Sequence, residues 1–242
     1  MTIKALVAVR SGSLRVKNKN LRLFAGSNLL TLKLEQLKRI KLLDGIIVNS
    51  NDDTMLEMAR SMGCEAVKRD EYYASNSVIM SEVYRNMAEN AKADVIAYIN
   101  VTNPLLEDDT ITRAIEEYCD YREEFDSLNS AHLVKEFMFQ NGKPLNYDLR
   151  HQPRSQDLPD IAALNFAVNV LERQTMIDCM NVVGRKPRLF IIDELEASDI
   201  DNPIDFDFTE FVYKQKLSGE GTVLNKIYDI VLNCFPCEEV AA

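Results

Sequence analysis

Short apolar runs alternate with amphipathic segments along most of the chain. The apolar runs are rich in β-branched residues and predict buried strands at residues 3–9, 45–48, 65–67, 94–101 and 127–134. Between them, apolar residues at helical spacing predict helices at 29–40, 53–62, 81–91 and 108–121. Strand character returns at 164–170 and 188–192, and two further helices are predicted at 204–216 and 222–232.

Strands that alternate with helices of this length are typical of βαβ units, in which a mostly parallel sheet carries helices on both faces. The regular pattern stops at about 135–163, where Gly142-Lys143-Pro144, Pro153 and Pro159 interrupt it. We interpret this stretch as a β-rich insertion that reaches over the functional site of the domain or towards a partner subunit. The sequence therefore predicts an α/β fold with one domain over 1–217 and a C-terminal helix and tail over 218–242.

Charge is distributed unevenly along the chain. The formal net charge is −10, yet residues 1–42 carry ten Lys or Arg side chains and one acid, Glu35. Residues 193–210 are the opposite extreme, with eight acidic side chains and no Lys or Arg. A basic segment on an acidic body indicates a local anion site and no nucleic-acid partner, because the overall field would repel a polyanion.

Composition argues against several other classes of protein. Hydrophobic residues make up 46% of the chain and charged residues 27%, which is ordinary for a globular domain. No apolar run approaches the roughly 18 residues of a membrane span, and no secretory signal is apparent, so we expect a cytoplasmic protein without a membrane partner. The five scattered cysteines favour reduced thiols, and redox or zinc chemistry at the lone CxxC, Cys234 to Cys237, is the weaker interpretation.

The turn after the first predicted strand is the first candidate site. Residues 10–22 contain five cations and no acid, together with Gly12 and the hydroxyl groups of Ser11 and Ser13. Open parallel sheets bind ligands beyond the carboxyl ends of their strands, and free N–H groups with several cations there suit a polyphosphate. The pattern is neither GxGxxG nor a Walker loop. A solvated basic turn is the alternative interpretation.

The second candidate is Asp199-Ile200-Asp201. In an extended segment an i, i+2 pair directs both carboxylates to one side, where Mg²⁺ can take one or two of them together with phosphate oxygens. Such a pair is weak evidence by itself, because an acidic run is usually a solvated face. It gains weight here, since a polyphosphate site needs both cationic donors and a metal.

The loop Arg10-Ser11-Gly12-Ser13, with Arg15 and Lys19-Asn20 after it, resembles the signature of the acylneuraminate (nonulosonate) cytidylyltransferases, relatives of the 3-deoxy-manno-octulosonate enzymes. Further matches keep the order of the family motifs. They are residues 46–50, Lys68-Arg69, Thr102-Asn103-Pro104-Leu105, residues 154–159, Asn165-Phe166-Ala167, and Ser198-Asp199-Ile200-Asp201 with Asp205. Six ordered matches are far more specific than any one of them.

The resemblance implies a three-layer, Rossmann-like nucleotidyltransferase fold and a homodimer in which the insertion packs onto the partner. The implied reaction transfers CMP from CTP to the anomeric hydroxyl of a sialic acid-like 2-keto sugar acid, with release of pyrophosphate. Catalysis then rests on positioning and charge neutralisation, without a covalent nucleophile. The implied site residues are Arg10, Ser13, Arg15, Lys19, Asn20 and Arg69 for the nucleotide, Asp199 and Asp201 for Mg²⁺, and Asn100, Arg154, Gln156 and Asn165 for the carboxylated sugar. Of these, Arg10, Lys19, Asp199 and Asp201 carry catalysis.

Departures from the family pattern gather on the acceptor side. Near the nucleotide, Leu14 replaces a Lys. On the acceptor side, Asn100 replaces a Gln, Phe166 a Gly and Asn169 a Tyr. This distribution predicts an intact activation centre with an unusual acceptor. Three alternatives stay open: an enzyme of the same fold with another nucleotide or acceptor acid, a catalytically lapsed binding protein, and a generic anion-binding α/β protein.

Overall fold

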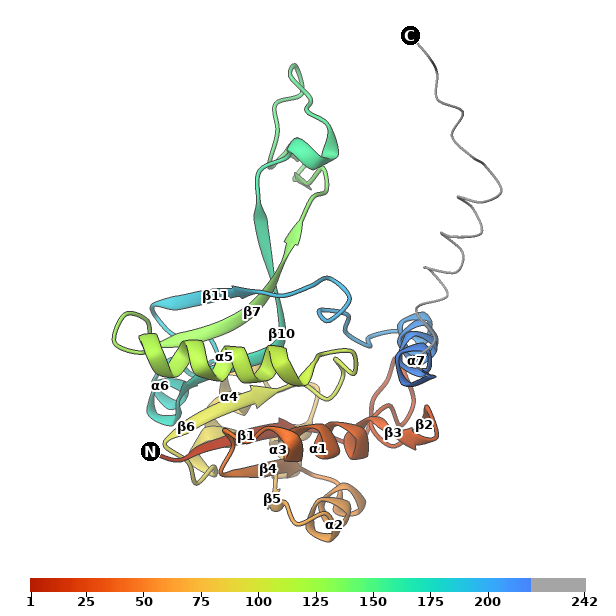
Figure 1. Ribbon diagram of the computed structural model, residues 1–242, viewed down its shortest axis with the longest axis vertical. Coiled ribbons are helices and arrows are strands. Elements are labelled where there is room, and N and C mark those ends of the chain that lie inside the picture. The colour runs from red at the N-terminus through yellow and green to blue at the C-terminus, as the bar shows by residue number, and fades with distance from the viewer. Residues whose placement is uncertain (219–242) are drawn as a thin grey trace.

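A computed structural model places a seven-stranded sheet between two layers of helices (Figure 1). The structure describes residues 1–218, so the helix predicted at 222–232 and the CxxC at Cys234 lie outside the described residues. The strand order is β11-β7-β10-β6-β1-β4-β5. The strands are β1 (Ile3–Ala8), β4 (Gly45–Ser50), β5 (Glu65–Lys68), β6 (Val95–Ile99), β7 (Ser127–Val134), β10 (Ile161–Glu172) and β11 (Pro187–Ile191). Strand β10 is antiparallel to both neighbours and the other adjacent pairs are parallel, which confirms the predicted mostly parallel α/β fold.

The alternation of side chains along the central strands creates two cores. Ala5 and Val7 of β1 pack under one layer of helices, whereas Leu6 packs under the other. The first layer consists of α1 (Leu29–Arg39), α2 (Asp53–Ser61), α5 (Asp108–Tyr121) and α7 (Pro203–Ser218). The second consists of α4 (Met80–Glu89) and α6 (Arg173–Cys179), beside the short α3 (Glu71–Ala74). Because the central strands are buried on both faces, they read in the sequence as continuous apolar runs.

The longer helices begin and end close to their predicted positions, and local capping explains why. The side chain of Asn28 accepts a hydrogen bond from Thr31 N at the start of α1, and Asp52 does the same for Met55 N at the start of α2. Gly63 follows α2 with φ +73°, a conformation that suits glycine. Four short elements were not predicted, because they are too short to show a period: α3, α6, and the hairpin of β2 (Leu23–Phe24) and β3 (Ser27–Asn28).

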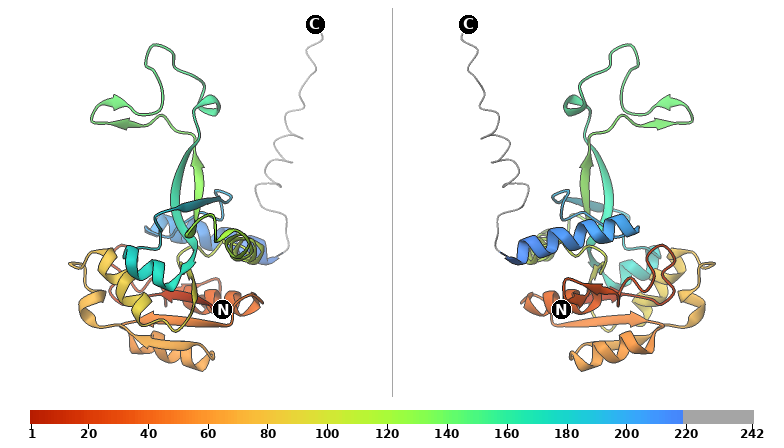
Figure 2. Two further views of the ribbon diagram at one scale, coloured as in Figure 1. Left: turned by 90° about the vertical axis from the view of Figure 1, so that its left-hand side faces the viewer. Right: turned by 90° about the vertical axis from the view of Figure 1, so that its right-hand side faces the viewer.

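Strands β7 and β10 extend beyond the sheet as a two-stranded arm that carries the insertion at its tip (Figures 1 and 2). The insertion begins after Val134 and ends where β10 starts at Ile161, slightly earlier than predicted. It contains the hairpin of β8 (Phe139–Gln140) and β9 (Lys143–Pro144) and one 3₁₀ turn at Ser155–Asp157. We name this two-stranded projection and its tip the arm.

Two features considered from composition, membrane spans and cysteines, can be compared with the described residues. No helix within residues 1–218 is long and apolar enough to cross a membrane. Cys64, Cys119 and Cys179 are free cysteines.

Phe24 joins the β2–β3 hairpin to α7. Its ring is fully buried and lies edge-on to Phe206 and Tyr213, with centroid distances of 5.3 and 5.5 Å. The guanidinium of Arg22 stacks on the ring of Phe206, 4.5 Å from its centroid. The hairpin follows the first loop of the chain, so this contact attaches that loop to the C-terminal helix.

We expect Phe24→Ala to lower the free energy of unfolding by about 3–5 kcal/mol, because it leaves a cavity between the hairpin and α7. Urea unfolding followed by circular dichroism measures the change. Leu23→Ala is the matched control, since Leu23 is adjacent and 70% exposed, and its effect should stay within about 0.5 kcal/mol. Equal effects of the two substitutions would show that the Phe24 contact does not hold α7.

Candidate active site

A cleft of about 680 Å³ opens where the loop after β1 begins. This is the carboxyl edge of the parallel strands, where ligands of open α/β sheets bind. Much of the cleft's apolar lining comes from α4 and from Tyr98 of β6. Seven of the predicted site residues line the cleft: Arg10, Ser13, Arg15, Lys19, Asn20, Arg69 and Asp201.

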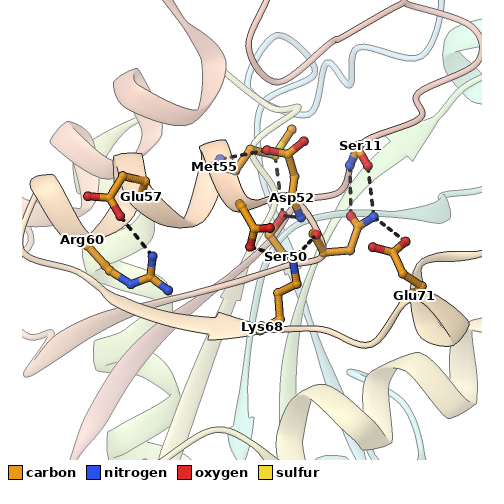
Figure 3. A network of polar contacts seen from close by, with 10 residues as sticks. Ser11, Ser50, Asp52, Met55, Glu57, Arg60, Lys68 and Glu71 are labelled. Atoms are coloured by element: carbon orange, nitrogen blue, oxygen red, sulfur yellow. Dashed lines mark hydrogen bonds and ion pairs between the residues drawn. The ribbon is translucent and has the colours of Figure 1, made fainter.

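The first loop is fixed at its start by Asn51, which directly follows β4. Asn51 Oδ1 accepts a hydrogen bond from Ser11 N (3.1 Å), and Asn51 Nδ2 donates to Ser11 Oγ and Glu71 Oε2, both at 3.0 Å. Lys68 donates to the carbonyl of Asn51 at 2.8 Å. Figure 3 shows this network joining the first loop to the ends of β4 and β5. The loop is therefore preformed at its first residues.

The far end of the loop is held by buried groups. Asn20 is 6% exposed and donates to the carbonyl of Arg10 at 3.3 Å, which closes the loop on itself. Val16 is inserted into the core. Gly12 has φ +79°, so a residue with a Cβ would be strained at this turn. These contacts leave three cations of the loop, Arg10, Arg15 and Lys19, in the lining of the cleft.

Two arginines connect the loop to neighbouring elements, Arg10 to the end of α3 and Arg69 to the ends of β1 and β4. Arg10 donates to the carbonyl of Ala74 (2.6 Å) and to Asn76 Oδ1 (2.7 Å), across the mouth of the cleft. Arg69 is buried and donates to the carbonyls of Val9 and Asn49, at the ends of β1 and β4. Burial lowers the pKa of Arg69. Its buried Nε has no hydrogen-bond partner within the described chain, so one donor of the guanidinium is unused.

The basic loop meets the acidic segment in space, although the two are far apart in sequence. Arg15 Nη2 lies 2.7 Å from Asp201 Oδ1, and Lys19 Nζ lies 4.0 Å from the same oxygen. Lys19 also donates to the carbonyl of Ile200. Burial lowers the pKa of Lys19, against the raising effect of Asp199 and Asp201. The two candidate motifs of the sequence thus form one site.

Thr102, which follows β6, lies beside Asp199. The Thr102 carbonyl accepts from Ile200 N at 2.9 Å, and its side chain is next to the Asp199 carboxylate. Asp199 is accessible from solvent, yet protein atoms crowd it, and this desolvation raises the pKa of its carboxyl. Asp201 adds to the rise as a neighbouring negative charge.

The donor chemistry suits a hard cation that brings further ligands. Asp199 and Asp201 supply carboxylate oxygens, which Mg²⁺ prefers. Within residues 1–218, no group of three or more His, Cys, Asp or Glu side chains could hold a metal ion. A divalent cation at this pair would therefore complete its coordination with water or with the oxygens of a bound phosphate.

Asn100 and Asn165 lie on adjacent strands at the same edge of the sheet. Asn100 N donates to the carbonyl of Ala167, and Asn165 Oδ1 accepts from Ser130 Oγ (2.6 Å) and Ala167 N (3.2 Å). The Nδ2 group of Asn165 is buried without a partner among the described residues. Phe166, which follows Asn165, has φ +56° and lies where the register of β10 with β7 shifts. Neither Asn100 nor Asn165 is among the residues that line the cleft.

Arg154 and Gln156 do not join the other predicted residues. Both are exposed at the 3₁₀ turn of the arm, and neither lines the cleft of its own chain. Arg154 Nε donates to Asp157 at 2.6 Å. Within one chain, the fold therefore brings the predicted nucleotide-side residues together but leaves Arg154 and Gln156 apart from them.

A model of a protein family described as cytidylyltransferase matches residues 4–150. The chain belongs to this cytidylyltransferase family. It is therefore a nucleotidyltransferase, as the sequence motifs predict.

Relatives with assigned names narrow the group within the cytidylyltransferases. The chain is 25% identical over 227 residues to the post-translational flagellin modification protein B of Campylobacter coli, covering 88% of this chain and 96% of the relative. It is 22% identical over 224 residues to the pseudaminic acid cytidylyltransferase of Campylobacter jejuni, covering 86% and 95%. These matches confirm the resemblance to nonulosonate cytidylyltransferases, of which the chain is a divergent member.

A solved structure supports the fold. The CMP:2-keto-3-deoxy-manno-octonic acid synthetase complexed with CTP superimposes with a TM-score of 0.68, at 10% identity, over 89% of this chain and 100% of that chain. At this identity the likeness supports the nucleotidyltransferase architecture alone.

Sequence patterns missed several residues that shape the cleft of this cytidylyltransferase. Asn51 follows an apolar run and carries no motif, so its role in fixing Ser11 appears only when β1 and β4 pair. Tyr98 and Met87 read as ordinary core residues, yet both line the cleft. Thr102 was part of a recognised motif, but its contact with Asp199 depends on how the C-terminal segment folds back.

Proposed function

We propose that this enzyme transfers CMP from CTP to the anomeric hydroxyl of a nine-carbon 2-keto sugar acid and releases pyrophosphate. The observation that carries the proposal is the meeting of the basic loop with Asp201, two residues after Asp199, in the lining of one cleft. The named relatives act on, or are named for, pseudaminic, legionaminic and acylneuraminic acids, which supports a carboxylated sugar as the acceptor.

On the nucleotide side, Arg10, Lys19 and Arg15 are suited to the triphosphate. Their side chains line the cleft, and their present partners are carbonyls and one carboxylate that phosphate oxygens can replace. Ser13 and Asn20 supply a hydroxyl and an amide beside them. Arg69 lies deeper, where it shapes the floor through the strand-end carbonyls.

Asp199 and Asp201 are proposed to hold Mg²⁺, because two oxygen ligands beside a phosphate site match its preference. When bound, the ion supplies neutralisation of charge on the phosphates. Arg15 and Lys19 contact Asp201 in the enzyme without substrates, so an ion that binds Asp201 would compete with these two cations.

The proposed chemistry is direct substitution at the α-phosphorus of CTP. The bond from phosphorus to the acceptor oxygen forms as the bond to pyrophosphate breaks, and the acceptor hydroxyl releases its proton. The protein contributes by aligning the two substrates and by placing Lys19 and Arg10 where negative charge grows on the leaving group. No covalent intermediate is required.

The acceptor is proposed to lie between the cleft and the edge formed by Asn100 and Asn165. The unpartnered Nδ2 group of Asn165 offers a donor for a sugar oxygen. Phe166 adds bulk beside it, and changes of pocket bulk typically alter discrimination by about 1–3 kcal/mol. We therefore propose that plain N-acetylneuraminate is a poorer acceptor than a modified or deoxygenated relative.

Arg154 and Gln156 are proposed to serve the active site of a second subunit in a homodimer. They lie on the arm, away from the cleft of their own chain. The arm also exposes Phe139 (54%), Leu145 (53%) and Leu149 (62%), an apolar surface that a partner would cover. Arg154 would then pair with the sugar carboxylate in exchange for Asp157.

We expect Asp201→Asn to reduce kcat/KM at least ~100-fold, because the pair loses a charged oxygen ligand without a change of shape. Pyrophosphate release at saturating Mg²⁺ measures it, with circular dichroism as the check on folding. Asp207→Asn, at an exposed position of α7, is the control of equal charge change and should retain activity. Full turnover of Asp201→Asn would contradict the metal assignment.

Lys19→Ala is expected to weaken CTP binding by about 1.5–3 kcal/mol, the range for hydrogen bonds to charged groups. The loss should shrink as salt rises, since phosphate contacts are screened. Isothermal titration calorimetry at two ionic strengths measures both effects. Lys41→Ala removes an equal charge from an exposed position after α1 and should bind CTP like the wild type. Unchanged affinity of Lys19→Ala would make Lys19 only a surface cation.

Arg154→Lys should raise the KM for the sugar acid far more than the KM for CTP, because Lys cannot form the bidentate pair. Arg150→Lys, elsewhere in the arm and exposed, is the matched control. A neutral sugar or a sugar phosphate that proves the better acceptor would refute the carboxylate role of Arg154.

Complementation tests which subunit Arg154 serves. Coexpression of Arg154→Ala and Asp201→Asn chains produces mixed dimers with one intact site if the arm reaches the partner, which restores about a quarter of wild-type activity. If Arg154 serves its own cleft, no intact site exists and the mixture stays inactive.

A further inference from the structure

Lys33 is the most deeply buried charged side chain outside the cleft. It lies on α1 with 2% exposure, beside a cavity of about 240 Å³ between α1, the β6–α5 connection and α7. Nothing in the proposed chemistry uses it. Burial of an ammonium group is unfavourable unless the group has well-placed partners, so its contacts indicate what it does.

The two hydrogen bonds of Lys33 lead towards the active site. Its Nζ donates to Gln36 Oε1 on the same helix (2.6 Å) and to the carbonyl of Asn103 (3.1 Å). Asn103 belongs to the connection that follows β6 and is completely buried. Lys33 therefore holds the backbone of this connection from the side opposite the cleft.

Asn103 in turn holds the segment that leads into the aspartate pair. Its Nδ2 donates to the carbonyls of Ala197 (3.1 Å) and Ser198 (3.0 Å). The carbonyl of the adjacent Thr102 accepts from Ile200 N, and the Thr102 side chain lies beside Asp199. Thr102 and Asn103 thus fix residues 197–200 at several points. Lys33 in turn bonds the carbonyl of Asn103.

We propose that Lys33 is a positioning residue for the reaction, which acts through Asn103 to hold Asp199 and Asp201 in place. This inference rests on the proposed function, because it matters only if the aspartate pair takes part in the reaction. Lys33 touches neither substrate nor the aspartates, so its effect falls on kcat and on metal binding, with little change in the KM for CTP.

The charge state of Lys33 provides a signature of this role. Burial lowers the pKa of Lys33 from 10.5 to about 7, against the raising effect of Asp108. The other charged or titratable groups around the cavity are Arg39, Glu107, Tyr213 and Lys216. Arg39 pairs with Asp108 and Lys216 with Glu107. Lys33 therefore changes charge near neutral pH.

Activity and stability should respond to this titration in opposite directions. A charged donor bonds the Asn103 carbonyl more strongly than a neutral amine does, so the positioning effect weakens as pH rises through about 7. Stability changes the other way. Between about 7 and 10.5 the unfolded chain binds the proton and the folded chain does not, so folding is favoured as pH rises.

The test compares the wild type with Lys33→Met. We expect kcat to be about tenfold lower in the variant at pH 6, and the difference to shrink by about pH 8.5. The affinity for Mn²⁺ in the presence of CTP, measured by electron paramagnetic resonance, should fall in parallel. Over the same range, the unfolding midpoint of the wild type should rise relative to the variant. Lys38→Met, exposed on the same helix, is the control and should change none of these.

A double-mutant cycle tests the route through Asn103. If Lys33 acts through it, Asn103→Ser and Lys33→Met should each lower kcat, and the double variant should lose little more than Asn103→Ser alone. Additive effects, or a kcat ratio of wild type to Lys33→Met that does not change with pH, would overturn the proposal. Lys33→Gln keeps a polar side chain without the charge and replaces Lys33→Met if the latter does not fold.

Failure of this inference is distinguishable from failure of the proposed function. If Asp201→Asn is inactive while Lys33→Met behaves like the wild type, only the positioning role is wrong. If Asp201→Asn is fully active, the metal role of the aspartate pair is wrong, and if the wild type releases no pyrophosphate from CTP with any sugar acid, the proposed function itself is wrong.

Discussion

The contact between the first loop and the segment before the last described helix is the constraint on which the site depends. Arg15 and Lys19 meet Asp201 and the carbonyl of Ile200, and nearby Phe24 packs on Phe206. Neither segment makes the proposed site alone, since that site combines the cations of the loop with the carboxylates of the acidic segment. Opposite charge brings the two together, and the aromatic contact, which salt does not screen, keeps them together.

Preorganisation is the theme shared by the surrounding contacts. Asn51 fixes the start of the loop, Asn20 its end, and Thr102 with Asn103 the aspartate segment. Each of these groups is a buried or half-buried amide or hydroxyl whose partners are mostly backbone atoms. Such bonds add little net stability, but breaking one leaves an unsatisfied buried group, which is unfavourable. The site therefore has one well-defined arrangement before substrate arrives, as expected where catalysis rests on positioning.

The sequence predicted what depends on local pattern and missed what depends on packing. Strands β1, β4 and β6 were readable because burial on both faces requires continuous apolar runs, and α1 and α5 because they are long enough to show a period. The charge pattern correctly paired the basic loop with the acidic segment. It also counted Lys33 in the basic segment, although this side chain is buried on α1 and faces away from the cleft. Placing Arg154 needs the path of the arm, which few local signals determine.

Phe166 and Asn169, two departures from the family pattern, form one physical unit. Phe166 adopts a left-handed backbone conformation, φ +56°, that is unfavourable by about 1–3 kcal/mol for a residue other than glycine. Asn169 Nδ2 donates to the carbonyl of Phe166 (3.1 Å), and its Oδ1 accepts from Asn129, which also bonds the carbonyl of Val182. A tyrosine at position 169 has no amide group, so it could not bond both Asn129 and the carbonyl of Phe166 as Asn169 does. The Phe at 166 thus requires support of the kind that Asn169 gives. Because Asn169 is held by buried hydrogen bonds to Asn129 and to the carbonyl of Phe166, this edge of the sheet is a built feature of the fold.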